Sequence, residues 1–297
     1  MAQPRIIVPG ASYLLTRRTN QRVLRLRPDP LTNQIARYCI AWAAMKTGVL
    51  IHALVLMSNH EHMVVTDPNA LLPDFLREAH RAMAKALNAA QGQWENLWAA
   101  KPAGVTLLPT LDDVVDKIAY TAANPVEAGL VELPEQWPGV NDWEPGKVLI
   151  VERPRLYFDP RGGSLAAVKL EIVPPRQVQG DLSAWNERVH EAVETKVKEA
   201  QAKIRSAGRK FAGESAVRHR TIRECAASFE PKREICPAVS ARDSLVRNRR
   251  LAELKEFRRT YRAAKLEWTR GNRQVAFPYG TWWMRVHHKA NVLPAPP

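Results

Sequence analysis

The sequence predicts an α+β fold, in which a ferredoxin-like antiparallel sheet packed with helices is followed by a basic, mainly helical C-terminal region. The periodicity of apolar residues in the first half gives the order strand, helix, strand, strand, helix, strand, helix. This order is the ferredoxin-like pattern with one helix added at its end. The second half carries arginine and lysine at helical spacing, which predicts the basic helices.

The first elements follow from local patterns. A short strand is expected around 12–17, and apolar residues recur at helical spacing over 31–47, before a glycine that can end the helix. Two strands, 49–57 and 60–65, come next. Antiparallel pairing of these strands would place residues 60–65 near the centre of the sheet.

The next helix is expected over 70–90, with Asp74 near its start, where a negative charge complements the helix dipole. One side of it is basic and is either a solvated face or a surface that follows phosphates; it carries Arg77, His80, Arg81 and Lys85. A fourth strand is expected over 105–108. The helix over 112–123 should end there, because Pro125 disfavours helical geometry in the residue before it.

Prolines punctuate the chain beyond residue 131, where we expect an edge strand at 168–173. Helices are expected over 185–204 and 242–270, and a final turn and strand over 277–288. The second of these helices would use Leu251, Leu254, Tyr261 and Leu266 as its apolar stripe. Three segments result: 1–145, a Pro-rich connecting segment over 146–180, and the basic, mainly helical region over 181–297.

The chain has 297 residues and a formal net charge of +14, which favours a polyanionic partner, nucleic acid before membrane. A generally basic proteome would be the alternative explanation. The three cysteines, Cys39, Cys225 and Cys236, have no paired short spacing, which fits a reducing compartment. No apolar run reaches membrane-spanning length, so we expect a soluble, cytoplasmic and nucleoid-associated bacterial protein without a membrane partner.

Two histidines stand two positions apart in the third expected strand. Side chains at i and i+2 of a strand share a face, so His60 and His62 would stand side by side and could grip one divalent ion. The alternative is that both are structural or exposed. A second stretch favours the first interpretation: Tyr120 and Asn124 share one face of a helical turn. Two imidazoles, an amide oxygen and a phenol suit metal-assisted attack on a phosphodiester.

These two stretches resemble a known family. His60-Glu61-His62 resembles the His-hydrophobic-His motif of HUH single-strand endonucleases. The segment from Tyr120 to Val131 resembles the region around the catalytic tyrosine of IS200-type Y1 transposases. Its Asn-Pro-Val after the tyrosine is most similar to the REP-associated tyrosine transposases. The resemblance covers roughly residues 5–145, which would be the Y1 transposase-like HUH catalytic domain.

The resemblance implies a transposase-like endonuclease and strand transferase that acts on single-stranded DNA, at hairpin-forming repeats. Tyr120 would form a 5′-phosphotyrosine intermediate, and His60, His62 and Asn124 would hold Mg²⁺ or Mn²⁺. The chain would act as a monomer or a homodimer. The cations that we expect to contact DNA are Arg17, Arg18, Arg77, Arg81, Lys85, Arg249, Arg250, Arg258, Arg259 and Arg262.

Glu61 departs from the family, which has an apolar residue between the histidines. On an exposed face Glu61 would cost little, whereas an unpaired carboxylate on a buried face would be expensive. A role for Glu61 as a metal ligand or base is disfavoured, since i+1 points away in a regular strand. Two other functions remain open: a domesticated DNA-binding protein that does not cut, and a metal-dependent nuclease that uses water.

Overall fold

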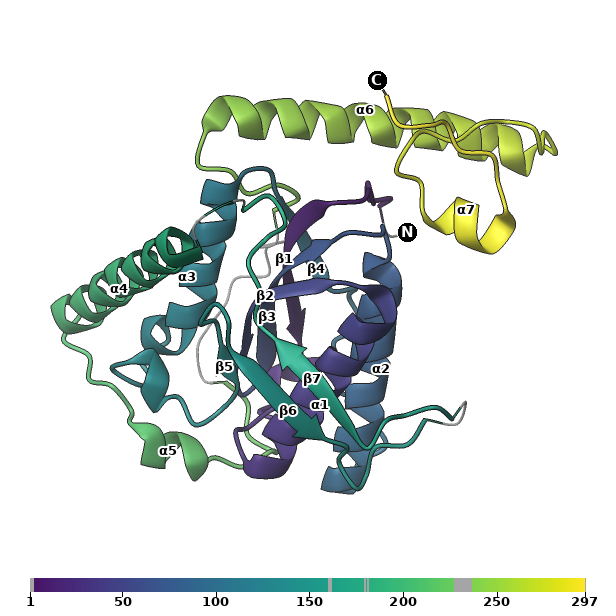
Figure 1. Ribbon diagram of the computed structural model, residues 1–297. Coiled ribbons are helices and arrows are strands. Elements are labelled where there is room, and N and C mark those ends of the chain that lie inside the picture. Colours follow the sequence, from purple (N-terminus) through teal and green to yellow (C-terminus); the bar gives the residue numbers. More distant parts are fainter. Residues whose placement is uncertain (1–2, 160–161, 179, 181, 227–236, 297) are drawn as a thin grey trace.

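The computed structural model of the chain describes residues 3–159, 162–178, 180, 182–226 and 237–296. Its centre is a five-stranded antiparallel sheet in the order β4-β1-β3-β2-β5 (Figure 1). The strands are β1 (Ala11–Arg18), β2 (Leu50–Leu56), β3 (His60–Asp67), β4 (Gly104–Leu108) and β5 (Asn141–Asp142). The histidine strand β3 is therefore the central strand, as the sequence predicts.

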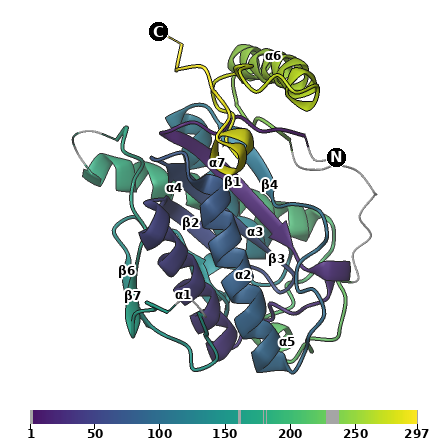
Figure 2. The ribbon, with the colours of Figure 1, turned by 90° about the vertical axis from the view of Figure 1, so that its right-hand side faces the viewer.

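Helices cover both faces of this sheet. On one face lie α1 (Pro30–Thr47) and α2 (Leu72–Gln91), and on the other lies α3 (Leu111–Glu127) (Figure 2). The order from β1 to α3 is the predicted one, so the ferredoxin-like α+β fold is confirmed. Alternation along β3 sorts its side chains: Met63 and Val65 pack toward α1 and α2, whereas Val64 packs toward α3.

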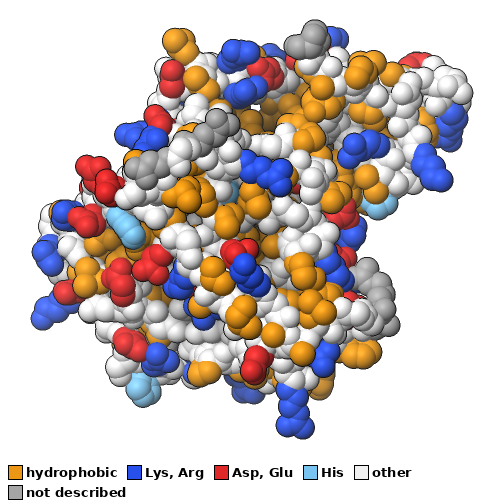
Figure 3. Space-filling view, in the orientation of Figure 1, with side chains coloured by type: hydrophobic (Ala, Val, Ile, Leu, Met, Phe, Trp, Pro, Cys, Tyr) orange, Lys and Arg blue, Asp and Glu red, His pale blue; other side chains and the backbone are white. Residues whose placement is uncertain are grey.

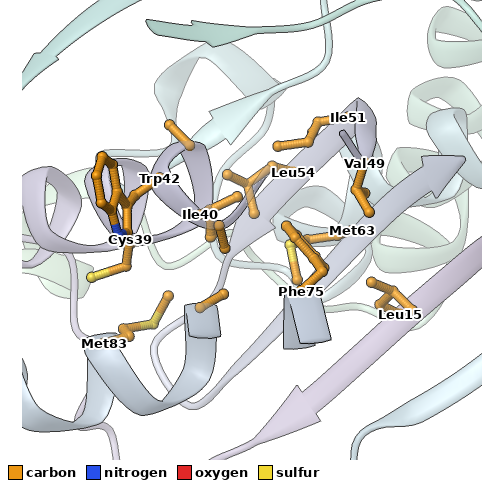
Figure 4. Packing of buried hydrophobic residues seen from close by; sticks show 14 of the residues in the cluster. Leu15, Cys39, Ile40, Trp42, Val49, Ile51, Leu54, Met63, Phe75 and Met83 are labelled. Carbon is orange, nitrogen blue, oxygen red and sulfur yellow. The ribbon is translucent and has the colours of Figure 1, made fainter. Parts of the chain in front are cut away.

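The larger apolar core lies between the sheet and the pair α1 and α2. Leu15, Leu54 and Met63 project from the strands toward the side of Phe75 of α2, and Met83 of α2 belongs to the same cluster (Figure 4). All five side chains are fully buried. Burial on this scale holds the central strand in one register, because a slip of one residue would send its apolar side chains to the other face.

The ends of α1 follow from its sequence. The Asp29 side chain accepts a hydrogen bond from the Thr32 backbone N–H (2.8 Å), and Pro30 occupies the first turn. Gly48 ends the helix in the left-handed conformation at φ 76°, where a glycine is favoured. The predicted helix and its stop are confirmed.

The prediction that the tyrosine helix ends near Ala123 is wrong. The helix α3 starts with a capping box formed by Thr110 and Asp113, and it continues through Pro125 to Glu127. Pro125 is buried, and its carbonyl accepts from the Leu130 N–H (3.0 Å). Packing of this turn against the core therefore outweighs the loss of one backbone hydrogen bond at the proline.

The chain beyond residue 145 packs back onto this body. The strands β6 (Val148–Glu152) and β7 (Ala167–Glu171) form an antiparallel pair against α1, in agreement with the expected strand near 168–173. The helix α4 (Leu182–Ser206) lies against α3 and shares its apolar cluster. The residues of α4 in that cluster are Trp185, Val189, Val193, Val197 and Ala200. Cys236 and residue 181, the expected start of the third segment, lie outside the described residues.

The remaining elements are α5 (Glu214–Arg218), α6 (Ser244–Thr269) and α7 (Trp283–His288), together with the short 3-10 turns η1 (Asn20–Arg22) and η2 (Pro134–Gln136). The helix α6 lies across the end of the sheet at which β1 and α3 begin (Figure 1). Its apolar stripe differs from the prediction: Phe257 and Ala264 are buried, and Leu251 and Leu266 are exposed.

The final strand expected over 277–288 is also wrong, because α7 occupies residues 283–288. Phe277 and Met284 are both fully buried, and they share one apolar cluster with Ala264 of α6. None of the helices within the described residues is long and apolar enough to cross a membrane.

Candidate active site

His60 and His62 lie side by side on one face of β3. Their ring centroids are 5.0 Å apart, with the ring planes at 85°. Val64, the next residue on that face, packs toward α3, so both imidazoles project from the sheet toward the tyrosine helix. The spacing of the two histidines alone predicted this arrangement.

A neighbouring side chain fixes the tautomer of His60. Asn59 donates its amide N–H to the Arg22 carbonyl (3.2 Å), and its Oδ1 lies 2.7 Å from Nδ1 of His60. Since Oδ1 can only accept, Nδ1 of His60 is the donor in this pair. In the neutral ring the lone pair is then on Nε2, the form in which a histidine binds a metal ion.

Thr16 holds His62 from the adjacent strand. The two residues are directly opposite in the pairing of β1 with β3, and Thr16 Oγ1 lies 2.9 Å from Nδ1 of His62. Burial lowers the pKa of His62 well below its ordinary value of 6.5, and the charges of His60 and Arg18 lower it further. His62 is therefore a neutral imidazole at neutral pH, as a metal ligand must be.

The helix α3 brings Tyr120 to the histidines. The centroid of its ring lies 5.3 Å from that of His62, edge to face at 77°. Burial raises the pKa of Tyr120, with a further contribution from Glu127, whereas a hydrogen bond with Asn124 and the charge of Arg18 lower it. An amide that donates its N–H to the phenol keeps its carbonyl oxygen for another partner.

Two cations stand close to the phenol. Arg18 is directly opposite His60 across the β1–β3 pair, and its charge acts on both His62 and Tyr120. Lys117 precedes Tyr120 by one helical turn, and its Nζ lies 5.7 Å from the centroid of the tyrosine ring. The site thus combines two imidazoles, of which His62 is neutral at neutral pH, with an amide, a phenol and positive charge.

Arg17 projects to the other face of the sheet. Its guanidinium lies 5.5 Å from the ring centroid of Trp98, and its Nη1 lies 3.4 Å from Nδ1 of His80. Burial lowers the pKa of Arg17, although the nearby carboxylate of Glu61 raises it. Of the two adjacent arginines, only Arg18 faces the histidines.

The question raised by Glu61 has a clear structural answer: the face is buried and the carboxylate is paired. Glu61 points toward α2, where its Oε1 accepts a hydrogen bond from Nε2 of His80. His80 is 3 % exposed, and its carbonyl accepts from Trp98 Nε1 (2.9 Å). The expectation that His80 belongs to the basic side of its helix is therefore wrong.

The other cations expected to contact DNA lie away from these groups. On α2, Arg77 pairs with Asp74 (2.6 Å) and Arg81 with Glu78 (3.2 Å), and this helix covers the opposite face of the sheet from Tyr120. Lys85 is exposed on the same helix. Contact of these three residues with DNA stays a prediction.

The expected DNA contacts on α6 lie at the far end of the body from the histidines, because His60 pairs with the last residue of β1 whereas α6 lies beside its first residues (Figure 1). Several of them are engaged within the helix or with the N-terminal segment. Arg249 and Arg250 pair with Glu253, Arg259 pairs with Glu256, Arg258 reaches the Pro4 carbonyl, and Arg262 is exposed. Their contact with DNA also stays a prediction.

The donor set fits a divalent ion. The described residues contain no group of three or more His, Cys, Asp and Glu side chains suited to a metal. A metal at this site would therefore rest on His60 and His62 with an amide oxygen, and Asn124 supplies one beside the phenol. Imidazole and oxygen donors together suit Mn²⁺ and, with bound water, Mg²⁺.

Sequence reasoning missed the residues that hold this site in place. Thr16 and Asn59 orient the histidines, and Asn141 donates its side-chain N–H to the Ala122 carbonyl of α3 (3.1 Å). An Asn next to a His-x-His pair is a local signal that could have been used. The partners in β1 and β5 depend on strand register, for which the sequence carries no local signal.

No family model and no curated protein matches the chain. Among solved structures, a REP-associated tyrosine transposase bound to a REP hairpin is similar at 22% identity and a TM-score of 0.40, over 47% of this chain and 81% of that chain. A candidate transposase from Deinococcus radiodurans R1 is similar at 22% identity and a TM-score of 0.28, over 35% of this chain and 84% of that chain. Both likenesses are to the fold of part of this chain.

Proposed function

We propose that the protein is a transposase-like endonuclease and strand transferase that cuts single-stranded DNA at hairpins and forms a 5′-phosphotyrosine intermediate. The observation that supports this most directly is the contact between Tyr120 and His62, with ring centroids 5.3 Å apart. A nucleophile and two imidazoles meet there, although they come from a helix and a strand far apart in the sequence.

His60, His62 and Asn124 would hold a divalent ion, Mg²⁺ or Mn²⁺. When bound, the ion would polarise the phosphodiester and stabilise the leaving oxygen. The hydrogen bond from Nδ1 of His60 to Asn59 leaves Nε2 of that ring for the ion, and the low pKa of His62 keeps the second ring neutral at neutral pH.

The Tyr120 oxygen would attack the phosphorus and form a phosphotyrosine ester, while the bond to the 3′ oxygen breaks and that oxygen takes a proton. The number of phosphoester bonds is conserved, so the reverse reaction can rejoin a strand without ATP. Arg18 and Lys117 would offset the charge of the phosphate and of the ionised phenol. Because one chain contains the whole set, we propose that Tyr120 acts with the histidines of its own protomer.

The proposed partner is DNA, in the cytoplasm and at the nucleoid. The net charge of +14 supports a polyanionic partner. On the face that Figure 3 draws, lysine and arginine side chains are mixed with acidic ones and form no single basic patch. The cations beside Tyr120 are therefore the most specific support for phosphate binding at the site.

The test is covalent capture of a hairpin oligonucleotide with a single-stranded tail in Mn²⁺, followed by a denaturing gel. We expect the label to remain on the protein when it is at the 3′ end and to be released when it is at the 5′ end. Tyr120→Phe should abolish the adduct, and Tyr279→Phe, which changes a tyrosine outside the site, should not.

Undiminished capture by Tyr120→Phe would refute the proposal. Multiple turnover without any adduct, surviving in Tyr120→Phe, would instead indicate a nuclease that uses water. Hairpin binding without metal, with no scission under any divalent ion, would indicate a DNA-binding protein that does not cut.

A further inference from the structure

A pocket of about 550 Å³ is lined by residues from the end of α4 to the start of α5 and by Glu132 and Gln136, which follow α3. Figure 1 shows the path of the chain from α4 to α5. The lining of the pocket includes three cationic side chains and one aromatic ring: Arg205, Arg209, Lys210 and Phe211. None of these residues belongs to the candidate active site. All of them come from the region after residue 145, beyond the part of the chain that carries the histidines and the tyrosine.

The charge of this pocket favours an anionic ligand. Its lining contains two acidic residues, and one of them, Glu214, is paired with Arg218 (2.7 Å). Within the described residues, Arg205, Arg209 and Lys210 form no ion pair with a carboxylate. Three cations around one hollow, with few carboxylates to neutralise them, are suited to phosphate groups.

The walls of the pocket are fixed to the tyrosine helix. The Ala212 N–H donates to the Gly129 carbonyl (3.0 Å), and the Gly213 N–H donates to the Leu130 carbonyl (2.9 Å). A glycine is favoured at position 129, because its φ is +72° and the Cβ of any other residue would lie 3.0 Å from the Arg209 guanidinium. The loop that carries the cations is thus seated directly on the end of α3.

The pocket lies a short way along the chain from the phenol. From Tyr120 to Glu127, where α3 ends two residues before Gly129, the helix spans about 10 Å, which is the length of about three stacked nucleotides. Lys117 stands beside Tyr120, and the charges of Lys196 and Lys203 on α4 act on Glu127, which lies between the phenol and the pocket. A strand that leaves the active site along α3 would pass Lys117, Lys196 and Lys203, which lie among the carboxylates of Glu127 and Glu199.

We propose that this pocket binds the single-stranded DNA that flanks the cleavage site. Arg205, Arg209 and Lys210 bind its backbone phosphates, and one base stacks on Phe211. The inference rests on the proposed function for the position of the cut, but the pocket uses none of the residues that would perform it. Stacking on an aromatic ring tolerates any base, so this interaction adds affinity for a single strand without reading its sequence.

The experiment measures the affinity of the full chain for three labelled DNAs: a blunt hairpin, and the same hairpin with a 5′ or a 3′ single-stranded tail. We expect the wild type to bind one tailed hairpin more tightly than the blunt one. Arg209→Gln/Lys210→Gln should bind that tailed hairpin only as tightly as the blunt one. Its slope of log affinity against log salt should become shallower by about 0.7 for each phosphate that the variant no longer neutralises.

A second variant isolates the ring. Phe211→Leu should bind the tailed hairpin about tenfold more weakly. Removing the bases from the tail should weaken the wild type to the same extent and leave Phe211→Leu unchanged. The matched control is Arg155→Gln/Lys169→Gln, which removes two exposed cations near β6 and β7 and should bind all three DNAs like the wild type.

Failure of this inference differs from failure of the proposed function. If the wild type forms the tyrosine adduct but the pocket variants bind tailed hairpins as it does, the pocket assignment is wrong. If the wild type forms no adduct yet the pocket variants lose the preference for a tail, the pocket binds single strands and the cleavage proposal is wrong. Free inorganic phosphate that competes as well as the tail would identify a small-anion site and would also overturn the inference.

Discussion

Glu61 and His80 form a buried hydrogen bond between β3 and α2, on the face of the sheet opposite His60 and His62. Arg17 approaches the other nitrogen of the same imidazole (3.4 Å), so His80 lies between a guanidinium and a carboxylate. The charged residue within the His-x-His motif is thus paired inside the protein. The pair should matter for stability rather than for the chemistry of the site.

His80→Leu should lower the free energy of unfolding by about 3–5 kcal/mol, because it leaves the Glu61 carboxylate buried without its partner. Glu61→Leu/His80→Leu should recover most of this loss, since an apolar pair of similar volume needs no hydrogen bond. Urea unfolding measures the three values. Arg81→Leu, which changes the exposed neighbour of His80, is the control, and a double variant less stable than His80→Leu would contradict the assignment.

A metal ion bound by His60 and His62 should stabilise the folded protein. With Mn²⁺ at a hundred times its Kd, the free energy of unfolding should rise by about 2.7 kcal/mol, and EDTA should remove the gain. His60→Gln/His62→Gln should show no gain, whereas His219→Gln, an exposed histidine elsewhere, should behave as the wild type. Thermal unfolding with and without the ion measures this, and an equal gain in all three proteins would rule out the site.

The sequence predicts what depends on local spacing. The shared face of His60 and His62 follows from a repeat of two residues, and the element order from β1 to α3 follows from apolar periodicity. The meeting of Tyr120 with His62 was predicted only because the resemblance linked the two motifs. No periodicity shows which side of a sheet a later helix will cover.

The remaining details depend on tertiary packing. Because Pro125 disfavours helical geometry in the residue before it, the sequence predicted that α3 ends near Ala123. Burial of Pro125 and Val126 instead keeps the chain helical to Glu127. The partner of Glu61 comes from α2 and that of His62 from β1, and both depend on register and helix placement. The expected basic side of α2 wrongly included His80. The spacing of residues along the helix does not reveal that His80 faces the sheet.

His52 should make the fold sensitive to acid. It occupies the bulge between Ile51 and Ala53 in β2, donates from Nδ1 to the Val173 carbonyl (2.6 Å), and accepts at Nε2 from the Thr66 hydroxyl (2.8 Å). Burial lowers the pKa of His52 from 6.5 to about 4, although the bond to Val173 raises it slightly. Between these values the unfolded chain binds more protons than the folded one, so stability falls as the pH falls.

The contribution of His52 should be complete above pH 6.5 and should shrink by roughly 3 kcal/mol as the pH approaches 4. His52→Gln offers neutral donors and an acceptor, so its stability should lose this part of the pH dependence. Urea unfolding at several pH values compares the two proteins. Parallel curves for both between pH 6.5 and 4 would show that His52 does not carry the effect.

Arg18 should set the pH at which the tyrosine reacts. Its charge lowers the pKa of Tyr120, against the larger effect of burial, which raises it. Removing the charge raises that pKa, so Arg18→Gln should need a higher pH to reach half of its maximal rate of adduct formation. The rate at neutral pH should fall on the order of a hundredfold, as when one fixed donor to a developing charge is removed.

Arg17→Gln is the matched comparison, because the adjacent side chain projects to the other face of the sheet toward His80. It should lower stability and leave the pH at half-maximal rate unchanged, whereas Arg18→Lys should keep that pH close to the wild-type value. The rate of covalent capture of a tailed hairpin, measured over a range of pH in Mn²⁺, gives all four profiles. If the profile moves with Arg17→Gln and not with Arg18→Gln, the cation that acts on the phenol has been wrongly assigned.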